Sequence, residues 1–251
     1  MTFIELVFTG ILIGFFAGTL SIGGGIISIP ALLFIDPTIT IHEAMATSMH
    51  LMAISILGSV LHHWKIQKHF LKDQVMNSFY LVIPMCWLST TIALLLPDLI
   101  LRSILVFLLL LMGLVRLFCR SHHVQTKKVN IRLVQVVCAG VGALLGIGGS
   151  IFLVPMLRYY NVPVQKCLGI AAMNTFLISI NGVCIYQVNS FFYSGHILWQ
   201  PIIVMSLVTP IIAFFTTQLA IGYFTTRFID RMGTVVLFLS ALLTYMISFM
   251  N

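Results

Sequence analysis

The sequence predicts an all-α polytopic membrane protein with about eight transmembrane helices, arranged as two homologous halves of four helices each. Three observations lead to this fold class. Hydrophobic residues make up 60% of the chain and charged residues only 8%, with a mean hydropathy of +1.10, whereas a soluble domain carries about 25% charged residues. Long runs of the sequence contain no charge, and a glycine-rich break occurs inside two of them.

The charge-free runs define the spans, because a helix needs about 20 apolar residues to cross the hydrocarbon core of a bilayer. The run from Leu6 to Ile35 is too long for the apolar region of a cleavable signal peptide, so we expect it to form the first span. The first and fifth runs are longer than one crossing requires. The predicted spans are 6–33, 44–62, 74–96, 100–118, 133–157, 168–187, 197–222 and 232–250.

A basic segment, "RLFCRSHHVQTKKVNIR" at 116–132, separates the two halves. With eight crossings, this segment and both termini would share one side of the membrane, with eight basic residues there against five on the other side. Lys and Arg favour the cytoplasmic side, so we expect both termini in the cytoplasm. Contact of this loop with anionic lipid explains the basic charge without a nucleic-acid partner.

The glycine-rich breaks are the clearest sign of an internal repeat. "SIGGGIISIP" at 21–30 matches "GIGGSIFLVP" at 146–155, and "MHLMAISILGSV" at 49–60 matches "MNTFLISINGVC" at 173–184. We therefore predict a first repeat at 1–120, a cytoplasmic linker at 121–132 and a second repeat at 133–251. Because four is an even number of crossings, both halves should enter the membrane from the same side, as parallel repeats.

A run of glycines can unwind a helix and let a ligand approach the backbone. The N–H groups freed at the start of the next half-helix then favour an anion. The alternative is that the glycines only allow close helix packing. The candidate site residues in the two breaks are Gly23, Gly24, Gly25, Gly148, Gly149 and Ser150.

The polar residues at membrane depth favour an anion over a cation. No Asp or Glu lies deep in a predicted span, whereas intramembrane carboxylates mark cation sites. His50 and Asn174 occupy equivalent places in the two repeats, and an anion beside His50 would favour its protonated form, which makes His50 a candidate for a coupling proton. The alternatives are a packed His50 and hydroxyls that bond to the preceding helical turn. The candidates are Thr47, Ser48, His50, Asn174, Thr175 and Asn181.

We expect neither a metal nor another cofactor. The histidine pairs at 62–63 and 122–123 lie near predicted helix ends without a cysteine or carboxylate cluster beside them. The five cysteines form no CxxC pair, so buried free thiols are expected.

Taken together, "GTLSIGGGIISIP" with "ATSMHLMAI" in the first half and "GALLGIGGSIFLVP" with "AAMNTFLISINGV" in the second resemble the sulfite exporter TauE/SafE family of bacterial permeases. The resemblance covers nearly the whole chain. It implies a protein of the cytoplasmic membrane that moves small anions such as sulfite, organosulfonates and other organic anions. The Thr47-Ser48 pair reads Ala171-Ala172 in the second half, and Ser150 replaces the third glycine, so a shared site would be asymmetric.

The sequence thus predicts a secondary anion transporter that works by alternating access between the two halves. A passive anion channel is the first alternative, and an intramembrane enzyme or an assembly subunit is less favoured. "GIGGS" lacks the lysine and the serine or threonine that end a phosphate-binding loop, so no nucleotide-driven pump is expected. The expected partners are a small anion, a coupling proton and the lipid bilayer, with a homo-oligomer left open.

Overall fold

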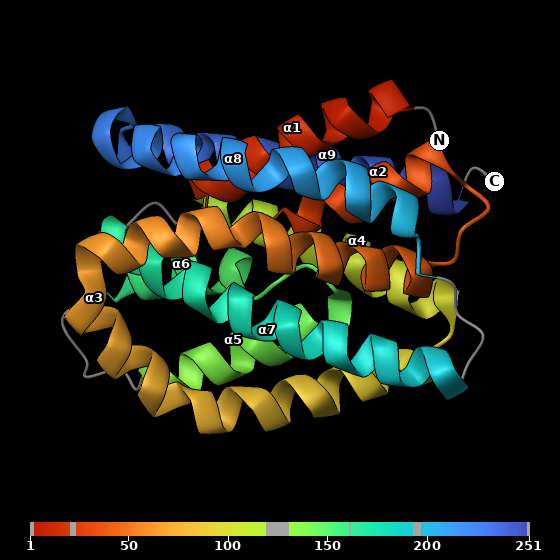
Figure 1. Cartoon of the computed structure of the whole chain (residues 1–251), viewed down its shortest axis with the longest axis horizontal. Coiled ribbons are helices and arrows are strands. Elements are labelled where there is room, and N and C mark those ends of the chain that lie inside the picture. Colours follow the sequence, from red (N-terminus) through yellow and green to blue (C-terminus); the bar gives the residue numbers. More distant parts are fainter. Residues whose placement is uncertain (1–2, 21–23, 119–130, 161, 193–196, 250–251) are drawn as a thin grey trace.

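The computed structural model of the chain describes residues 3–20, 24–118, 131–160, 162–192 and 197–249, except for the side chains of 66–77 and of several residues at helix ends. Every regular element in these ranges is a helix (Figure 1). Seven segments are long and apolar enough to cross a membrane, which confirms the all-α polytopic fold class. The helices are α1 (Phe3–Leu20), α2 (Gly25–Ile35), α3 (Ile41–Leu95), α4 (Asp98–Phe118), α5 (Ile131–Leu145), α6 (Ser150–Tyr159), α7 (Val164–Phe192), α8 (Trp199–Tyr223) and α9 (Thr226–Phe249).

Helix α3 joins the predicted second and third spans into one continuous helix. Its 55 residues would extend about 80 Å if straight, far more than a bilayer is thick. Instead α3 turns back on itself, as Figure 1 shows. Its two ends meet, because the N–H of Ile41 donates to Oδ1 of Asp98 at 2.6 Å and a ring nitrogen of His42 lies 3.2 Å from the carbonyl oxygen of Leu96. Residues 41–65 form its first arm and residues 78–95 its second arm.

The predicted glycine breaks are present in both halves. The first separates α1 from α2, and the second separates α5 from α6. Gly24, Gly146 and Gly148 have φ angles of 80°, 67° and 76°, a left-handed conformation that glycine adopts without steric cost. The short helices therefore begin at the glycines, and Pro30 and Pro155 lie inside them.

The first break reverses the chain. Helix α1 runs beside α8 in the same direction, with Gly10 against Met205 and Gly18 against Ala213. Helix α2 then begins beside Ile13, in the middle of α1, and leads back to the start of α3. The start of α3 lies at the same end of the molecule as the start of α8, because Thr47 and Leu198 are in contact. Helices α1 and α2 therefore form a hairpin that enters and leaves at one end.

The second break reverses the chain from the opposite end. In α5, the carbonyl group of Cys138 lies against Gly149. The sulfur atom of Cys138 is 3.8 Å from the sulfur atom of Met156 in α6, so α6 runs back along α5. Helix α6 ends where Arg158 pairs with Asp230 at the start of α9. We call this the basic end of the molecule, and the opposite end, where both termini lie in Figure 1, the terminal end.

These hairpins correct two predictions about topology. Helix α1 is long enough to span, but each hairpin returns to the end from which it entered and adds no net crossing. Each half therefore crosses three times, and the two halves have opposite orientations. The prediction of parallel halves is wrong because it counted each glycine-broken run as a crossing. For the same reason the described parts of the basic segment, residues 116–118 and 131–132, do not lie at the terminal end, since α4 ends and α5 begins at the basic end.

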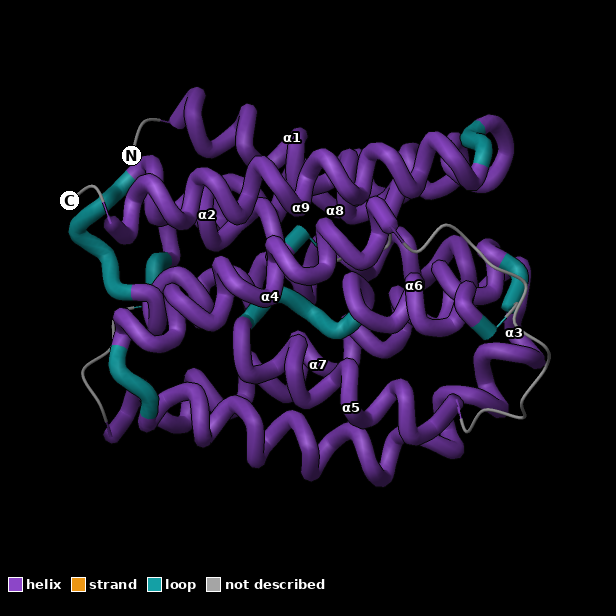
Figure 2. The backbone as a smooth tube through the Cα atoms, turned by 180° about the vertical axis from the view of Figure 1, so that it is seen from behind, coloured by secondary structure: helices purple, strands orange, loops and turns teal. Residues whose placement is uncertain are grey.

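Corresponding helices of the two halves pack on corresponding neighbours, although the extent of the contacts differs. Helix α1 packs on α8 as α5 packs on the second arm of α3, whereas the first arm of α3 pairs with α7 and α4 pairs with α9. Figure 2 shows loop segments inside the bundle, where the chain reverses. The repeat limits at 1–120 and 133–251 stay a prediction, and residues 121–130 of the linker lie outside the described residues.

Candidate functional site

The two glycine breaks contact each other at the centre of the bundle. A Cβ atom on Gly25 would lie 2.8 Å from Cα of Ile147 and 2.5 Å from the sulfur of Met52. A Cβ atom on Gly148 would lie 3.4 Å from the same sulfur. The start of α2, the loop before α6 and the first arm of α3 therefore meet around Met52. The glycines do allow close packing, and this packing brings the two breaks together.

Ser48 links the two halves by hydrogen bonds. Its hydroxyl accepts a hydrogen bond from Oγ of Ser28 at 2.8 Å and donates to the carbonyl oxygen of Gly146 at 3.0 Å. Ser28 and Ser48 are fully buried. These two bonds of Ser48 join α2, α3 and the second break, and both go to residues outside its own helix.

Three buried polar side chains beside the second break have no hydrogen-bond partner among the described residues. Ser150 begins α6, and Asn174 and Thr175 are neighbours on α7. None of the three is more than 2% exposed. The Ser150 hydroxyl, both ends of the Asn174 amide and the Thr175 hydroxyl are all unsatisfied. We call these three residues the break cluster. An unsatisfied buried donor or acceptor costs about 1–3 kcal/mol, so the break cluster is suited to holding a polar ligand.

The glycines of the second break let its backbone approach the break cluster. A Cβ atom on Gly148 would lie 2.9 Å from Cγ2 of Thr175, and one on Gly149 would lie 3.0 Å from Nδ2 of Asn174. Gly149 is the N-cap of α6 and supplies no side-chain cap, as is also true of Gly24 at the start of α2. The first N–H groups of a helix have no partner within the helix and carry a partial positive charge. The break cluster therefore lies at an uncapped, electropositive helix start.

The described acidic residues lie at helix ends or between helices, away from the breaks. Asp36 lies between α2 and α3, where the hydroxyl and N–H of Thr38 hold the pKa of its carboxyl group below the usual value. Within the part of the chain that the structure describes, no group of three His, Cys, Asp or Glu residues could hold a metal ion. The polar groups that face the breaks are therefore neutral.

His50 and Thr47 face other helices. Nδ1 of His50 donates to the carbonyl oxygen of Ala46 at 2.8 Å, and its other ring nitrogen lies 3.4 Å from Nε2 of Gln187 on α7. The edge of its ring contacts Trp199, with 5.8 Å between ring centroids. Thr47 accepts a hydrogen bond from the N–H of Leu198 at 3.4 Å. Both residues thus connect α3 to the start of α8, and His50 also reaches the end of α7.

The remaining candidates from the sequence are Asn181 and Gly23. The Asn181 amide donates to the carbonyl oxygen of Leu177 at 2.8 Å and accepts from Nε1 of Trp87 at 3.1 Å, so it is engaged outside the break cluster. Gly23 lies outside the described residues. Sequence reasoning missed Ser28 and Met52. Ser28 could have been found, because it is a polar residue at membrane depth like the other candidates. No sequence signal distinguishes Met52 from other core methionines.

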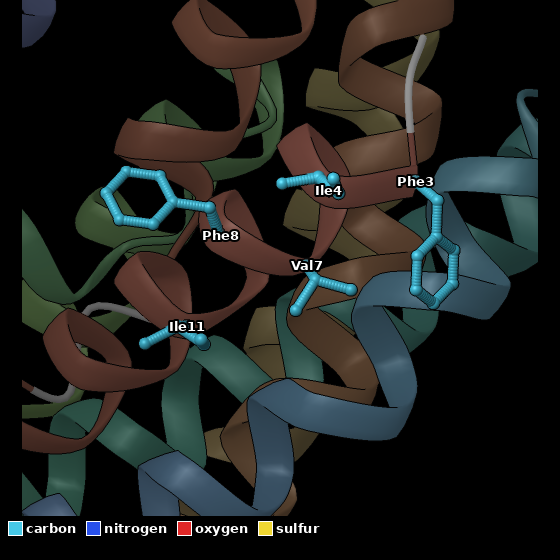
Figure 3. Close-up of a pocket in the computed structure, with 5 residues that line it drawn as sticks. All are labelled: Phe3, Ile4, Val7, Phe8 and Ile11. Atoms are coloured by element: carbon cyan, nitrogen blue, oxygen red, sulfur yellow. The ribbon is translucent and has the colours of Figure 1, made fainter.

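A hollow on the outer face of α1 is a different kind of site. Figure 3 shows Phe3, Ile4, Val7, Phe8 and Ile11 lining it, and all five are apolar. Phe3, Ile4 and Phe8 are more than 60% exposed. Such a surface suits contact with lipid chains and offers no polar group to an anion.

Two hairpins that enter from opposite ends and meet at a buried polar cluster indicate a membrane transport protein. Inverted halves with discontinuous helices recur among transporters. Residues 6–244 match the family described as sulfite exporter TauE/SafE, and the chain belongs to this family. The protein is a multi-pass membrane transporter.

Two curated relatives agree with this assignment. The chain is 28% identical over 199 residues to a probable membrane transporter protein of Haemophilus influenzae, with 72% of this chain and 73% of the relative covered. It is 25% identical over 191 residues to a probable membrane transporter protein of Methanocaldococcus jannaschii, with 72% and 71% covered. No solved structure matches the chain.

Proposed function

We propose that this transporter moves a small oxyanion, such as sulfite or an organosulfonate, across the cytoplasmic membrane and binds it at the break cluster. The observation that carries the proposal is the set of unsatisfied polar groups of Ser150, Asn174 and Thr175 at the uncapped start of α6. The two hydroxyls and the amide N–H₂ group can donate to anion oxygens, as can the first backbone N–H groups of the helix.

The chemistry of the break cluster favours a singly charged anion. Its donors are neutral, so a dehydrated dianion would find no cationic side chain to balance its charge. The amide oxygen of Asn174 is an acceptor and would repel an unprotonated anion oxygen. It suits the hydroxyl of a singly protonated oxyanion, because that hydroxyl can donate to it. Hydrogensulfite has both the charge and the hydroxyl, and the amide of Asn174 can also turn its donor group toward an organosulfonate.

The contacts at the terminal end support a carrier that alternates access. Thr47 and His50 connect α3 to α8 there, and the residues of the break cluster are almost completely buried. Opening toward the terminal end would separate α8 from α3. Substrate on the opposite side of the membrane accelerates exchange through a carrier and not through a channel, so a counterflow assay in proteoliposomes distinguishes the two. The substrate leaves chemically unchanged, since the break cluster contains no nucleophile paired with a base.

The distribution of basic residues supports an orientation opposite to the one expected from the sequence. Among the described residues, every Lys and Arg except Arg102 belongs to the basic end: Lys65, Lys68 and Lys72 lie where α3 turns back, and Arg116, Arg132, Arg158, Lys166, Arg227 and Arg231 lie near helix ends. We propose that this end is cytoplasmic and that both termini lie outside. In a background without the native cysteines, an impermeant thiol reagent should label Thr38→Cys and spare Thr126→Cys in intact cells. The reverse pattern would refute this orientation.

A change of charge in the break cluster tests the proposed substrate class. Asn174→Asp adds a carboxylate beside the anion, so uptake of sulfite, organosulfonates and small carboxylates into proteoliposomes should fall to background. Asn181→Asp on the same helix, outside the break cluster, is the matched control and should retain most uptake. If Asn174→Asp transports these anions normally, or gains cation transport, the anion site is wrongly placed.

A further inference from the structure

A second cluster of charged residues lies at the basic end, away from the break cluster. Three helices contribute to it: Arg116 near the end of α4, Arg158 at the end of α6 and Asp230 in the first turns of α9. Arg158 forms an ion pair with Asp230 through one guanidinium nitrogen and Oδ1. Both residues also lie close enough to Arg116 to act on its charge. The described part of this cluster has two cations and one anion.

The guanidinium group of Arg116 packs against α9 with one of its donors unused among the described residues. Its Nη1 atom occupies the space that a Cβ atom on Gly233 of α9 would fill. The same nitrogen is buried and has no hydrogen-bond partner in the part of the chain that the structure describes. A buried cationic donor without a partner is costly. Gly233 therefore allows Arg116 to approach Asp230, but no hydrogen bond uses the Nη1 donor.

We propose that Arg116 and Arg158 form a second oxyanion-binding subsite at the basic end, with Asp230 as an internal counter-ion that an incoming anion displaces. Guanidinium groups present paired N–H donors whose geometry matches two oxygens of a sulfur or phosphorus oxyanion. Two such groups around one carboxylate leave one positive charge and the Nη1 donor for a ligand. The partial exposure of Arg158 and Asp230, with side-chain values of 22% and 40%, gives the ligand access.

Helix α6 connects this subsite to the break cluster. Ser150 and Arg158 are eight residues apart on α6, which corresponds to about 12 Å along the helix axis. An oxyanion held at Arg158 would therefore be one helix length from the electropositive start of α6. The subsite would then be a loading position, which holds the anion before it moves to the break cluster. That role rests on the proposed transport function, whereas the existence of the subsite does not. The oxyanion comes either from solution or from the phosphate of a lipid headgroup.

Protection of arginine from chemical modification tests the subsite without measuring transport. The protein is placed in phosphatidylcholine nanodiscs, and phenylglyoxal labelling of Arg158 is followed by mass spectrometry with and without inorganic sulfate. A second preparation contains phosphatidylglycerol and no sulfate. Arg102 is the matched control, because it is also paired with an aspartate, Asp98 at 2.5 Å, and its side chain is 14% exposed. If sulfate protects Arg158 and not Arg102, the ligand is a soluble oxyanion. If phosphatidylglycerol protects Arg158 and sulfate does not, the ligand is a headgroup phosphate. Absence of protection in both preparations, or equal protection of Arg102, overturns the proposal.

Variants separate ligand binding from a purely structural ion pair. Asp230→Asn removes the competing carboxylate, so the concentration of the effective anion that half-protects Arg158 should fall about tenfold. A purely structural pair predicts lower thermal stability with no gain in protection, and that result overturns the proposal. Arg116→Gln should abolish protection, and Arg116→Lys should restore part of it. Asn174→Asp should leave protection unchanged, so a failure of the proposed transport function would not be mistaken for a failure of this subsite.

Discussion

Replacing Gly148 by alanine is the sharpest test of the role of the second break. Gly148 has a φ angle of 76°, a conformation that costs other residues about 1–2 kcal/mol. The new Cβ atom would also lie 2.9 Å from Cγ2 of Thr175, closer than the 3.5–4.0 Å at which carbon atoms attract each other. The strain can be relieved only if the backbone of the break or the side chain of Thr175 moves, and both belong to the proposed site.

The cost of the left-handed backbone conformation sets the size of the expected effect. A loss of about 1–2 kcal/mol corresponds to a factor of roughly 5–30 in an equilibrium constant. We therefore expect Gly148→Ala to weaken anion binding about tenfold, measured as the half-saturating concentration for uptake into proteoliposomes. Thermal unfolding of the purified protein provides a separate measure of the loss of stability.

Two further variants divide this effect into its causes. Thr175→Ser combined with Gly148→Ala removes the methyl group in contact and keeps the hydroxyl, so the double variant should recover the steric part of the loss. Gly222→Ala is the matched control, because a Cβ atom there meets nothing within 4 Å. The reasoning is refuted if Gly148→Ala binds the anion as tightly as the wild type, or if Gly222→Ala has the same effect.

Three other substitutions test single contacts. Ser48→Ala removes the bonds to Ser28 and Gly146, and should lower stability by about 1–3 kcal/mol; an unchanged unfolding temperature would contradict this. Thr40→Ala breaks the capping box of α3 and should cost about 1 kcal/mol, while uptake at saturating anion concentration should be retained. Nδ1 of His50 is engaged with Ala46, so a coupling proton would have to bind Nε2. Glutamine cannot take up that proton, so His50→Gln should keep transport and lose its pH dependence. A wild-type pH profile would assign His50 to packing alone.

The break cluster was only partly accessible from the sequence. Ser150, Asn174 and Thr175 were candidates because they are polar at membrane depth and follow a duplicated pattern. His50 met the same criteria, and so did Asn181, yet both face other neighbours. The direction of a side chain on a helix depends on small differences in rotation, since successive residues differ by about 100°. Thr47 and Ser48 show this directly, because one contacts Leu198 and the other contacts the second break.

The sequence by itself determined the membrane environment, the helical fold, the positions of both breaks and the family. Each of these depends on composition or on local pattern: too few charges for a soluble core, apolar runs long enough to span, and glycines where the backbone must take a left-handed angle. These properties are fixed by residues near one another in the chain, so no tertiary contact is needed to read them.

Only the tertiary structure decided the path of the chain and the composition of the site. A long apolar run can cross the membrane or reverse at a glycine break, and its hydropathy is the same in both cases. Contacts between distant residues select the reversal: Gly24 lies beside Ile13, and Gly25 lies beside Ile147. Because each reversal removes one crossing, these contacts invert the second half relative to the first, and they place the N-terminal starts of α2 and α6 together inside the bundle.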